Sequence, residues 1–192
     1  FVGSATLRTP PSQVAQDIRR TLAINTAHLR TLPTYRETLR YWIHQTEAAG
    51  IFVFRARDIA LEEARGFVMS DRYAPIIVLN SRDALAAQIF TLAHELAHVW
   101  LGHTGISNLE TTGHAVDQDS STVETYCNRV AADVILEPAE FRQVWSLAHH
   151  PDLAQAIEKT AREFKVSEEV VARRLLQEGK LDQQTYESVR AR

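Results

Sequence analysis

The residues with the clearest chemical potential are two histidines four positions apart, with a glutamate directly after the first. Residues 94–98 read His94-Glu95-Leu96-Ala97-His98, the pattern H-E-x-x-H. On a helix, residues four apart lie on one face with Cβ atoms about 5–6 Å apart, so one metal ion can sit between the two imidazoles. Glu95 lies at the flank of that face, where a carboxylate can hold and deprotonate water. The motif predicts a Zn²⁺ site with His94 and His98 as ligands and Glu95 as the catalytic acid/base.

The stretch around the motif has the properties of a buried helix. Residues 84–101 contain no glycine or proline, and Asn80 or Ser81 can cap the start of the helix. A turn of about 100° per residue places the two histidines opposite a stripe of large apolar side chains. This stripe consists of Leu85, Ile89, Leu92, Leu96 and Val99. One face of the helix is therefore suited to the core and the other to a metal ion.

A catalytic zinc site needs a third protein ligand, because zinc in such sites takes three side chains and a water molecule. The longer pattern H-E-x-x-H-x-x-G-x-x-H is excluded, since it requires Gly and His where the chain has Leu101 and Thr104. The polar segment at residues 104–120 and the residue before it offer further donors, but nothing in the sequence fixes their geometry. These donors are His103, His114, Asp117 and Asp119.

Glu124, 26 residues after His98, is the favoured third ligand. It belongs to a helix predicted over residues 121–136 and shares its inward face with Asn128, and an inward carboxylate is costly unless it is paired or binds a metal. Ser121 and Glu124 also fit a capping box, so a charge at the helix N-terminus is the alternative role. Asn128 would orient a ligand imidazole by a hydrogen bond, or would otherwise be an ordinary hydrogen-bonded amide.

The remaining elements predict an α+β fold that is mainly helical. Thr34 and Glu37 form a capping box for a helix that ends at Gly50. Three short stretches rich in Ile, Val and Phe predict a small antiparallel sheet packed on the metal helix. The predicted strands are residues 51–54, 66–70 and 76–79. The other predicted helices are residues 12–24, 35–49, 139–148, 152–164, 167–177 and 182–190.

These elements divide the chain into three parts. An N-terminal helical segment covers residues 1–32, a zinc metallopeptidase core covers residues 33–137, and a C-terminal helical subdomain covers residues 138–192. The strand before the metal helix is the candidate substrate-binding element, because an extended peptide can add to an exposed strand. Its residues are Ile77, Val78, Leu79 and Asn80. An ordinary core strand is the alternative for the same pattern.

Composition limits the partners of the chain. A net charge of −3 over 192 residues gives no basic field to attract nucleic acid, so no direct nucleic-acid binding is expected. No apolar run reaches the roughly 20 residues of a membrane span. The single Cys127, expected to be a small buried residue, fits a reducing cytoplasm. A turn at residues 164–167, followed by Arg173 and Arg174, is similar to a helix-turn-helix, but ordinary helix packing explains it.

Several separated blocks of the chain resemble the ImmA/IrrE family of bacterial metallopeptidases. The central blocks are FTLAHELAH at residues 90–98 and ETYCNRVAA at residues 124–132. Shorter blocks that agree in order are GI at 50–51, RGF at 65–67, PIIVLN at 75–80 and ARRL at 172–175. The resemblance implies a gluzincin-like zinc site with His94, His98 and Glu124 as ligands. Asn128 occupies the position where gluzincins carry an acid.

The resemblance also implies a biological role. Members of the family cleave helix-turn-helix repressors of the XRE type, which relieves repression in mobile elements or after DNA damage. They often carry a repressor-like DNA-binding domain upstream, so a chain that starts at Phe1 would be the C-terminal part of such a protein. Two other functions stay open: a non-proteolytic regulator that senses zinc or a ligand and binds a repressor or DNA, and a toxin–antitoxin component. The complete H-E-x-x-H motif argues against a degenerate site.

Overall fold

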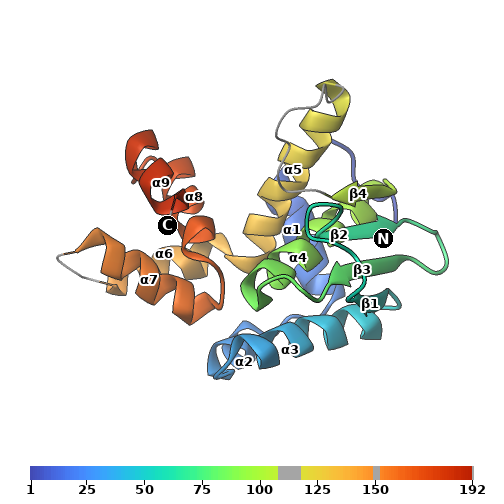
Figure 1. Ribbon diagram of the computed structural model, residues 1–192, viewed down its shortest axis with the longest axis horizontal. Coiled ribbons are helices and arrows are strands. Elements are labelled where there is room, and N and C mark those ends of the chain that lie inside the picture. Colours follow the sequence, from blue (N-terminus) through green and yellow to red (C-terminus); the bar gives the residue numbers. More distant parts are fainter. Residues whose placement is uncertain (108–117, 149–151, 192) are drawn as a thin grey trace.

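The computed structural model describes residues 1–107, 118–148 and 152–191 (Figure 1). The helix that carries the motif, α4 (Leu85–Leu101), lies at its centre and contacts helices as well as a small sheet. The other helices are α1 (Pro11–Thr21), α2 (Thr26–Thr31), α3 (Tyr35–Ala48), α5 (Gln118–Ile135), α6 (Pro138–Leu147), α7 (Leu153–Phe164), α8 (Glu168–Gln177) and α9 (Gln183–Arg190). The strands are β1 (Phe52–Ala56), β2 (Gly66–Met69), β3 (Ile76–Asn80) and β4 (Gly105–Ser107).

Helix α4 is buried over most of its length, as its two-faced sequence predicts. It ends at Gly102, which has a left-handed backbone (φ 69°) and donates its N–H to the carbonyls of His98 and Val99. Its start differs from the prediction, because the N-cap is Ala84 and neither Asn80 nor Ser81 caps the helix. The Gln88 side chain instead donates to the Asp83 carbonyl at 2.7 Å and closes the first turn. The helix therefore begins without a side-chain N-cap, and a local hydrogen bond from Gln88 to the residue before the cap links its first turn to the preceding loop.

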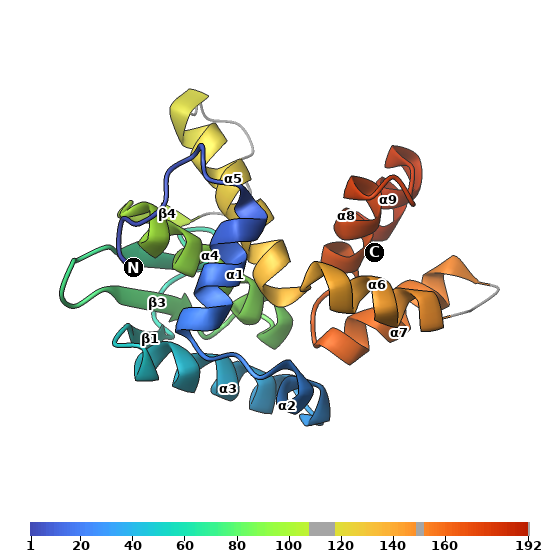
Figure 2. The same cartoon turned by 180° about the vertical axis from the view of Figure 1, so that it is seen from behind.

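Helices pack on α4 from several sides. Helices α1, α3 and α5 all contact it, and the rear view shows α1 lying across α4 and α5 (Figure 2). Trp100 of α4 donates its indole N–H to Asp17 of α1 at 2.7 Å and stacks on Phe1, so the N-terminal segment is tied to the end of α4. Within the described part of the chain, no helix combines the length and apolar character needed to cross a membrane.

The structure confirms a mainly helical α+β fold with a small sheet on the motif helix. The sheet of the described residues is mixed and not antiparallel, and it has a fourth, short strand beyond the three that were predicted. Its strand order is β1-β3-β2-β4, with β1 parallel to β3 and the other two pairs antiparallel. Strand β3 lies between β1 and β2, although it follows both in the sequence. It runs parallel to β1 and antiparallel to β2. Strand β4 has only three residues and lies in a stretch predicted as loop, where no apolar alternation marks it.

The two faces of the sheet have different surroundings. Val68, Ile77 and Leu79 are buried on the face that α4 covers, with exposed fractions of at most 1%. The opposite face is mostly apolar on the three longer strands, and Phe52, Phe54 and Met69 there are each more than half exposed. Phe67, Ile76 and Val78 also lie on this outer face and are half-buried, and the pair Ala56–Asn80 ends it.

Helices α6 to α9 follow α5 and lie together on one side of the molecule (Figure 1). All four appear where the sequence predicts them, whereas the six-residue α2 was not predicted because it has no apolar stripe and buries no residue. The two arginines on α8, the helix that follows this turn, do not form a free basic surface. Arg173 pairs with Glu169, and Arg174 is buried.

Arg174 is the polar link between this helical group and α5. Its guanidinium donates to Asp133 at 2.5 Å and to the Leu136 carbonyl at 3.0 Å, and its exposed fraction is 7%. A buried charge with two partners is costly to break because each partner is left desolvated.

Replacing Arg174 with leucine is therefore expected to lower the free energy of unfolding by about 3 kcal/mol. Arg173→Leu is the matched control: its pair with Glu169 is more than 40% exposed on both sides, so its loss should cost at most about 1 kcal/mol. Urea unfolding of both variants measures the difference. Equal losses for the two arginines would show that Arg174 does not hold the helical group on α5.

Candidate metal centre

Three side chains from two helices converge on one point. The Nε2 atoms of His94 and His98 lie 3.1 Å apart. One carboxylate oxygen of Glu124 lies 3.0 Å from His94 Nε2, and the other lies 3.3 Å from His98 Nε2. Within the described residues, these three form the one group whose histidine, cysteine or carboxylate atoms could hold a metal ion together. The structure thus brings together the ligand set predicted from the sequence.

The packing of α4 against α5 produces this convergence. His94 and His98 are 0% and 3% exposed, because the face of α4 that carries them is covered by α5. On α5, Cys127 and Ala131 are fully buried, and such small side chains let the two helices approach closely. Ser121 lies inside α5, which already begins at Gln118, so a capping box at Ser121 is excluded and Glu124 is directed at the histidines.

Asn128 fixes the orientation of one ligand. Its side-chain oxygen lies 3.0 Å from His94 Nδ1, so this ring nitrogen carries the proton and donates it to the amide oxygen. The lone pair of His94 is then on Nε2, which faces His98 and Glu124. Histidines that bind a metal through one ring nitrogen generally donate a hydrogen bond from the other, which fixes the orientation of the ring.

The three donor groups fit a zinc ion. Zinc binds histidine nitrogen and carboxylate oxygen at about 2.0–2.2 Å with tetrahedral geometry, which sets neighbouring ligand atoms roughly 3.3 Å apart. The observed separations of 3.0, 3.1 and 3.3 Å are close to that spacing. Three atoms that mainly accept hydrogen bonds face one another here, so a cation is the group that satisfies all of them.

Charge around the centre supports the same conclusion. Burial by itself would raise the pKa of the Glu124 carboxyl, but in the metal-free centre hydrogen bonds from, and positive charge on, His94 and His98 outweigh burial and lower that pKa to about 2. A bound cation in place of those protons would favour the ionised carboxylate in the same way. Burial raises the pKa of the Cys127 thiol, and the negative charges of Glu124 and Glu95 raise it further. Glu124 is therefore an ionised ligand, whereas Cys127 stays a protonated, buried thiol.

Glu95 is fully buried beside the two ligand histidines, on the side of α4 that faces strand β2. Gly66, the first residue of β2, lies directly against it: a Cβ built on this glycine would be 3.3 Å from Glu95 Oε1. Sequence reasoning did not single out this contact. The available signal was a glycine at the head of a strand, which often marks close approach of another group.

The other predicted ligands are not part of the cluster. The His103 side chain is exposed and lies outside the cluster. Its backbone carbonyl accepts a hydrogen bond from the Ser70 hydroxyl. His114 and Asp117 lie outside the described residues, as does the side chain of Asp119.

The predicted substrate-binding strand is placed where a peptide cannot pair with it. Residues Ile77, Val78, Leu79 and Asn80 belong to β3, which is hydrogen-bonded to β1 on one side and to β2 on the other. The Asn80 amide is also occupied, since it donates to the carbonyls of Ile59 and Ala64. The prediction of substrate binding by strand addition to these residues is therefore wrong, and the core-strand alternative holds.

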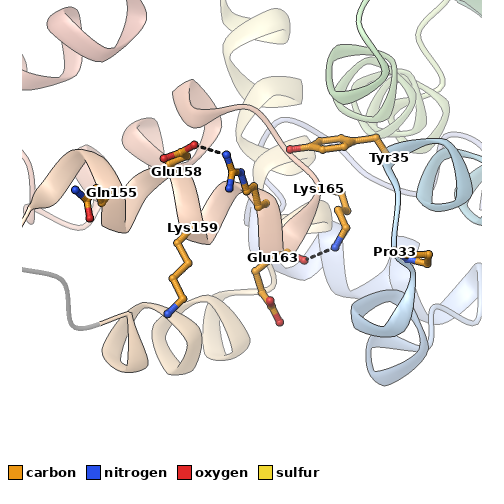
Figure 3. Close-up of a pocket in the computed structure, with 8 residues that line it drawn as sticks. Pro33, Tyr35, Gln155, Glu158, Lys159, Glu163 and Lys165 are labelled. Carbon is orange, nitrogen blue, oxygen red and sulfur yellow. Dashed lines mark hydrogen bonds and ion pairs between the residues drawn. The ribbon is translucent and has the colours of Figure 1, made fainter.

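A surface cavity of about 790 Å³ lies elsewhere, between α7 and the segment that joins α2 to α3 (Figure 3). Its walls are mostly charged, but Arg162 pairs with Glu158 and Lys165 donates to the Glu163 carbonyl. None of its lining residues belongs to the cluster of His94, His98 and Glu124. Despite its size, this cavity is not a competing candidate for the active site, because its lining provides neither a cluster of metal ligands nor an activated nucleophile.

Fold and site together define a helix pair of the H-E-x-x-H class, in which the following helix supplies the third candidate metal ligand. Comparison with protein families is consistent with this class: residues 46–176 match the model of the IrrE N-terminal-like domain, a peptidase family. The chain belongs to this family, which confirms the resemblance seen in its sequence blocks.

Other comparisons add the fold but no activity. No curated protein matches the chain. A solved structure described as a Mycobacterium tuberculosis transcriptional regulator matches 86% of this chain with a TM-score of 0.57 and 18% identity. The match covers 46% of that protein, so this chain spans about half its length.

Asn128→Ala is expected to weaken zinc binding about 10- to 100-fold, because His94 loses the hydrogen bond that fixes its ring. Asn128→Asp keeps an acceptor at the same place and should bind zinc at least as tightly as the wild type. Competition titration with a chromogenic chelator measures the two affinities. If the alanine variant binds zinc like the wild type, the His94–Asn128 bond does not contribute to the metal centre.

Proposed function

We propose that the chain is a zinc-dependent endopeptidase. The observation that carries this proposal is the joint placement of a His94–His98–Glu124 ligand set and the buried carboxylate of Glu95 on one helix pair. Three protein ligands leave the fourth zinc position to water and substrate, which is the arrangement of catalytic rather than structural zinc sites. Membership of a peptidase family supports the same activity.

The mechanism assigns one task to each residue. When bound, zinc supplies Lewis acidity that polarises the scissile carbonyl and makes water more acidic. His94, His98 and Glu124 hold the ion, and Asn128 holds the His94 ring. Glu95 takes the proton of the attacking water and passes it to the leaving amine, so a single carboxylate acts first as a base and then as an acid.

The proposed substrate is a helix-turn-helix repressor of the XRE type, whose cleavage would relieve repression after stress or in a mobile element. This proposal rests on the family to which the chain belongs. An extended substrate could pair only with β1 or β4, because these are the edge strands of the described sheet. The buried, reduced Cys127 fits a cytoplasmic site of action, where such repressors are found.

A non-proteolytic regulator is the second candidate, favoured by the fold shared with a protein described as a transcriptional regulator. It predicts stoichiometric binding of the repressor without cleavage. Binding of the repressor to zinc-loaded protein, measured by calorimetry alongside the cleavage assay, separates the two candidates.

Glu95→Gln is expected to keep zinc and lose at least about 100-fold in cleavage rate, because the proton acceptor is removed while the ligands stay in place. The test incubates purified protein with the repressor encoded nearby, with and without chelator, and follows fragments by mass spectrometry. Glu47→Gln, an exposed glutamate on α3, is the matched control and should cleave at the wild-type rate.

Two outcomes would overturn the proposal. Cleavage that is unaffected by chelator would exclude a zinc mechanism, and full cleavage by the Glu95 variant would exclude the role given to this carboxylate. Tight binding of the repressor by zinc-loaded wild type with no product would favour the non-proteolytic regulator.

A further inference from the structure

Gly66 occupies a crowded position in the middle of the sheet. It is the first residue of β2 and lies between Leu79 of β3 and Ser107 of β4. Its backbone is not in the left-handed region, so its conformation does not require a glycine. The requirement comes from space: a Cβ here would be 2.5 Å from the Thr91 methyl group and 3.0 Å from the Val78 carbonyl oxygen.

The third contact of this missing side chain is the proposed acid/base. Thr91 and Glu95 are one helical turn apart on α4, both are buried, and both face Gly66. A Cβ at position 66 would be 3.3 Å from Glu95 Oε1, closer than ordinary van der Waals contact. The β2 backbone at Gly66 therefore packs directly against the Glu95 carboxylate.

We propose that Gly66 is a positioning residue that sets where the Glu95 carboxylate lies relative to His94, His98 and Glu124. This inference rests on the proposed peptidase function. A general base has to lie within about 2.6–3.2 Å of the proton it removes, and a misplacement of about 1 Å costs on the order of 100-fold in rate. Any larger residue at position 66 displaces the carboxylate, α4 or both.

The competing interpretation is that Gly66 matters only for packing β2 on α4. The contact distances separate the two, because the shortest one involves the Thr91 methyl and not Glu95. Thr91→Ser removes that methyl group and the 2.5 Å contact, but it leaves the contact of the new Cβ with Glu95. Stability and catalysis should therefore respond differently to Thr91→Ser in a Gly66→Ala background.

The experiment compares Gly66→Ala, Thr91→Ser and the double variant. It measures the Tm of the metal-free protein, zinc affinity, the absorption spectrum of the Co²⁺-substituted protein, and kcat and KM for repressor cleavage. We expect Gly66→Ala to lower both Tm and kcat. In the double variant, Tm should recover toward that of Thr91→Ser, while kcat stays at least about 10-fold lower, with KM, zinc affinity and the Co²⁺ spectrum unchanged.

Val68→Ala is the matched control for loosened packing. Val68 is 1% exposed and lies two residues further along the same inner face of β2. Its truncation should lower Tm through a cavity but leave kcat within about threefold of the wild type. If kcat falls in Val68→Ala as it does in Gly66→Ala, or recovers together with Tm in the double variant, Gly66 is a packing residue only.

A double-mutant cycle with Glu95→Asp decides the question even if Thr91→Ser does not restore stability. Aspartate is one methylene shorter, which gives the Cβ at position 66 more room. The fold-loss in kcat caused by Gly66→Ala should therefore be smaller in the Glu95→Asp background than in the wild type. Equal fold-losses in both backgrounds would overturn the inference. A wild-type protein that does not cleave at all would instead contradict the proposed function.

Discussion

The structure depends on the close approach of two buried imidazole nitrogens and one partly exposed carboxylate. His94 and His98 are almost fully buried, and Glu124 is 29% exposed at its side chain. Such groups are expensive to desolvate unless each finds a partner. Helices α4 and α5 pack on each other through buried apolar side chains, and α1, α3 and the sheet also pack on α4. This packing holds the three polar groups together.

Much of this centre could be predicted from the chain because it depends on local spacing. The histidines follow from a four-residue repeat on a helix, and Glu124 follows from the inward face of the next helix. Helix ends at Gly50 and Gly102 and the cap at Thr34 are also local, and the structure confirms them. The start of α4 was not predicted correctly, since the helix begins at Leu85 with no side-chain cap, although Asn80 and Ser81 are residue types that often cap helices.

The sheet shows where local patterns stop being informative. Short stretches rich in Ile, Val and Phe identify β1, β2 and β3, but they do not say which strands are neighbours. Ile77 and Leu79 would look the same in a central strand and in an edge strand. Because β1 pairs with β3 in parallel, β3 is central, and a peptide cannot add to it as a further strand. The contact of Gly66 with Thr91 and Glu95 is likewise a product of strand order.

The distance in sequence between the ligands has a consequence for how the protein holds together. Glu124 follows His94 by 30 positions, so an ion bound to both closes a long loop much as a disulfide would. Closing such a loop removes conformational freedom from the unfolded chain, and the free energy of binding becomes free energy of folding. Under the proposed zinc binding, the amount of folded protein would be coupled by mass action to the free zinc concentration. Zinc supply would then set the lifetime of the protein in the cell as well as its activity.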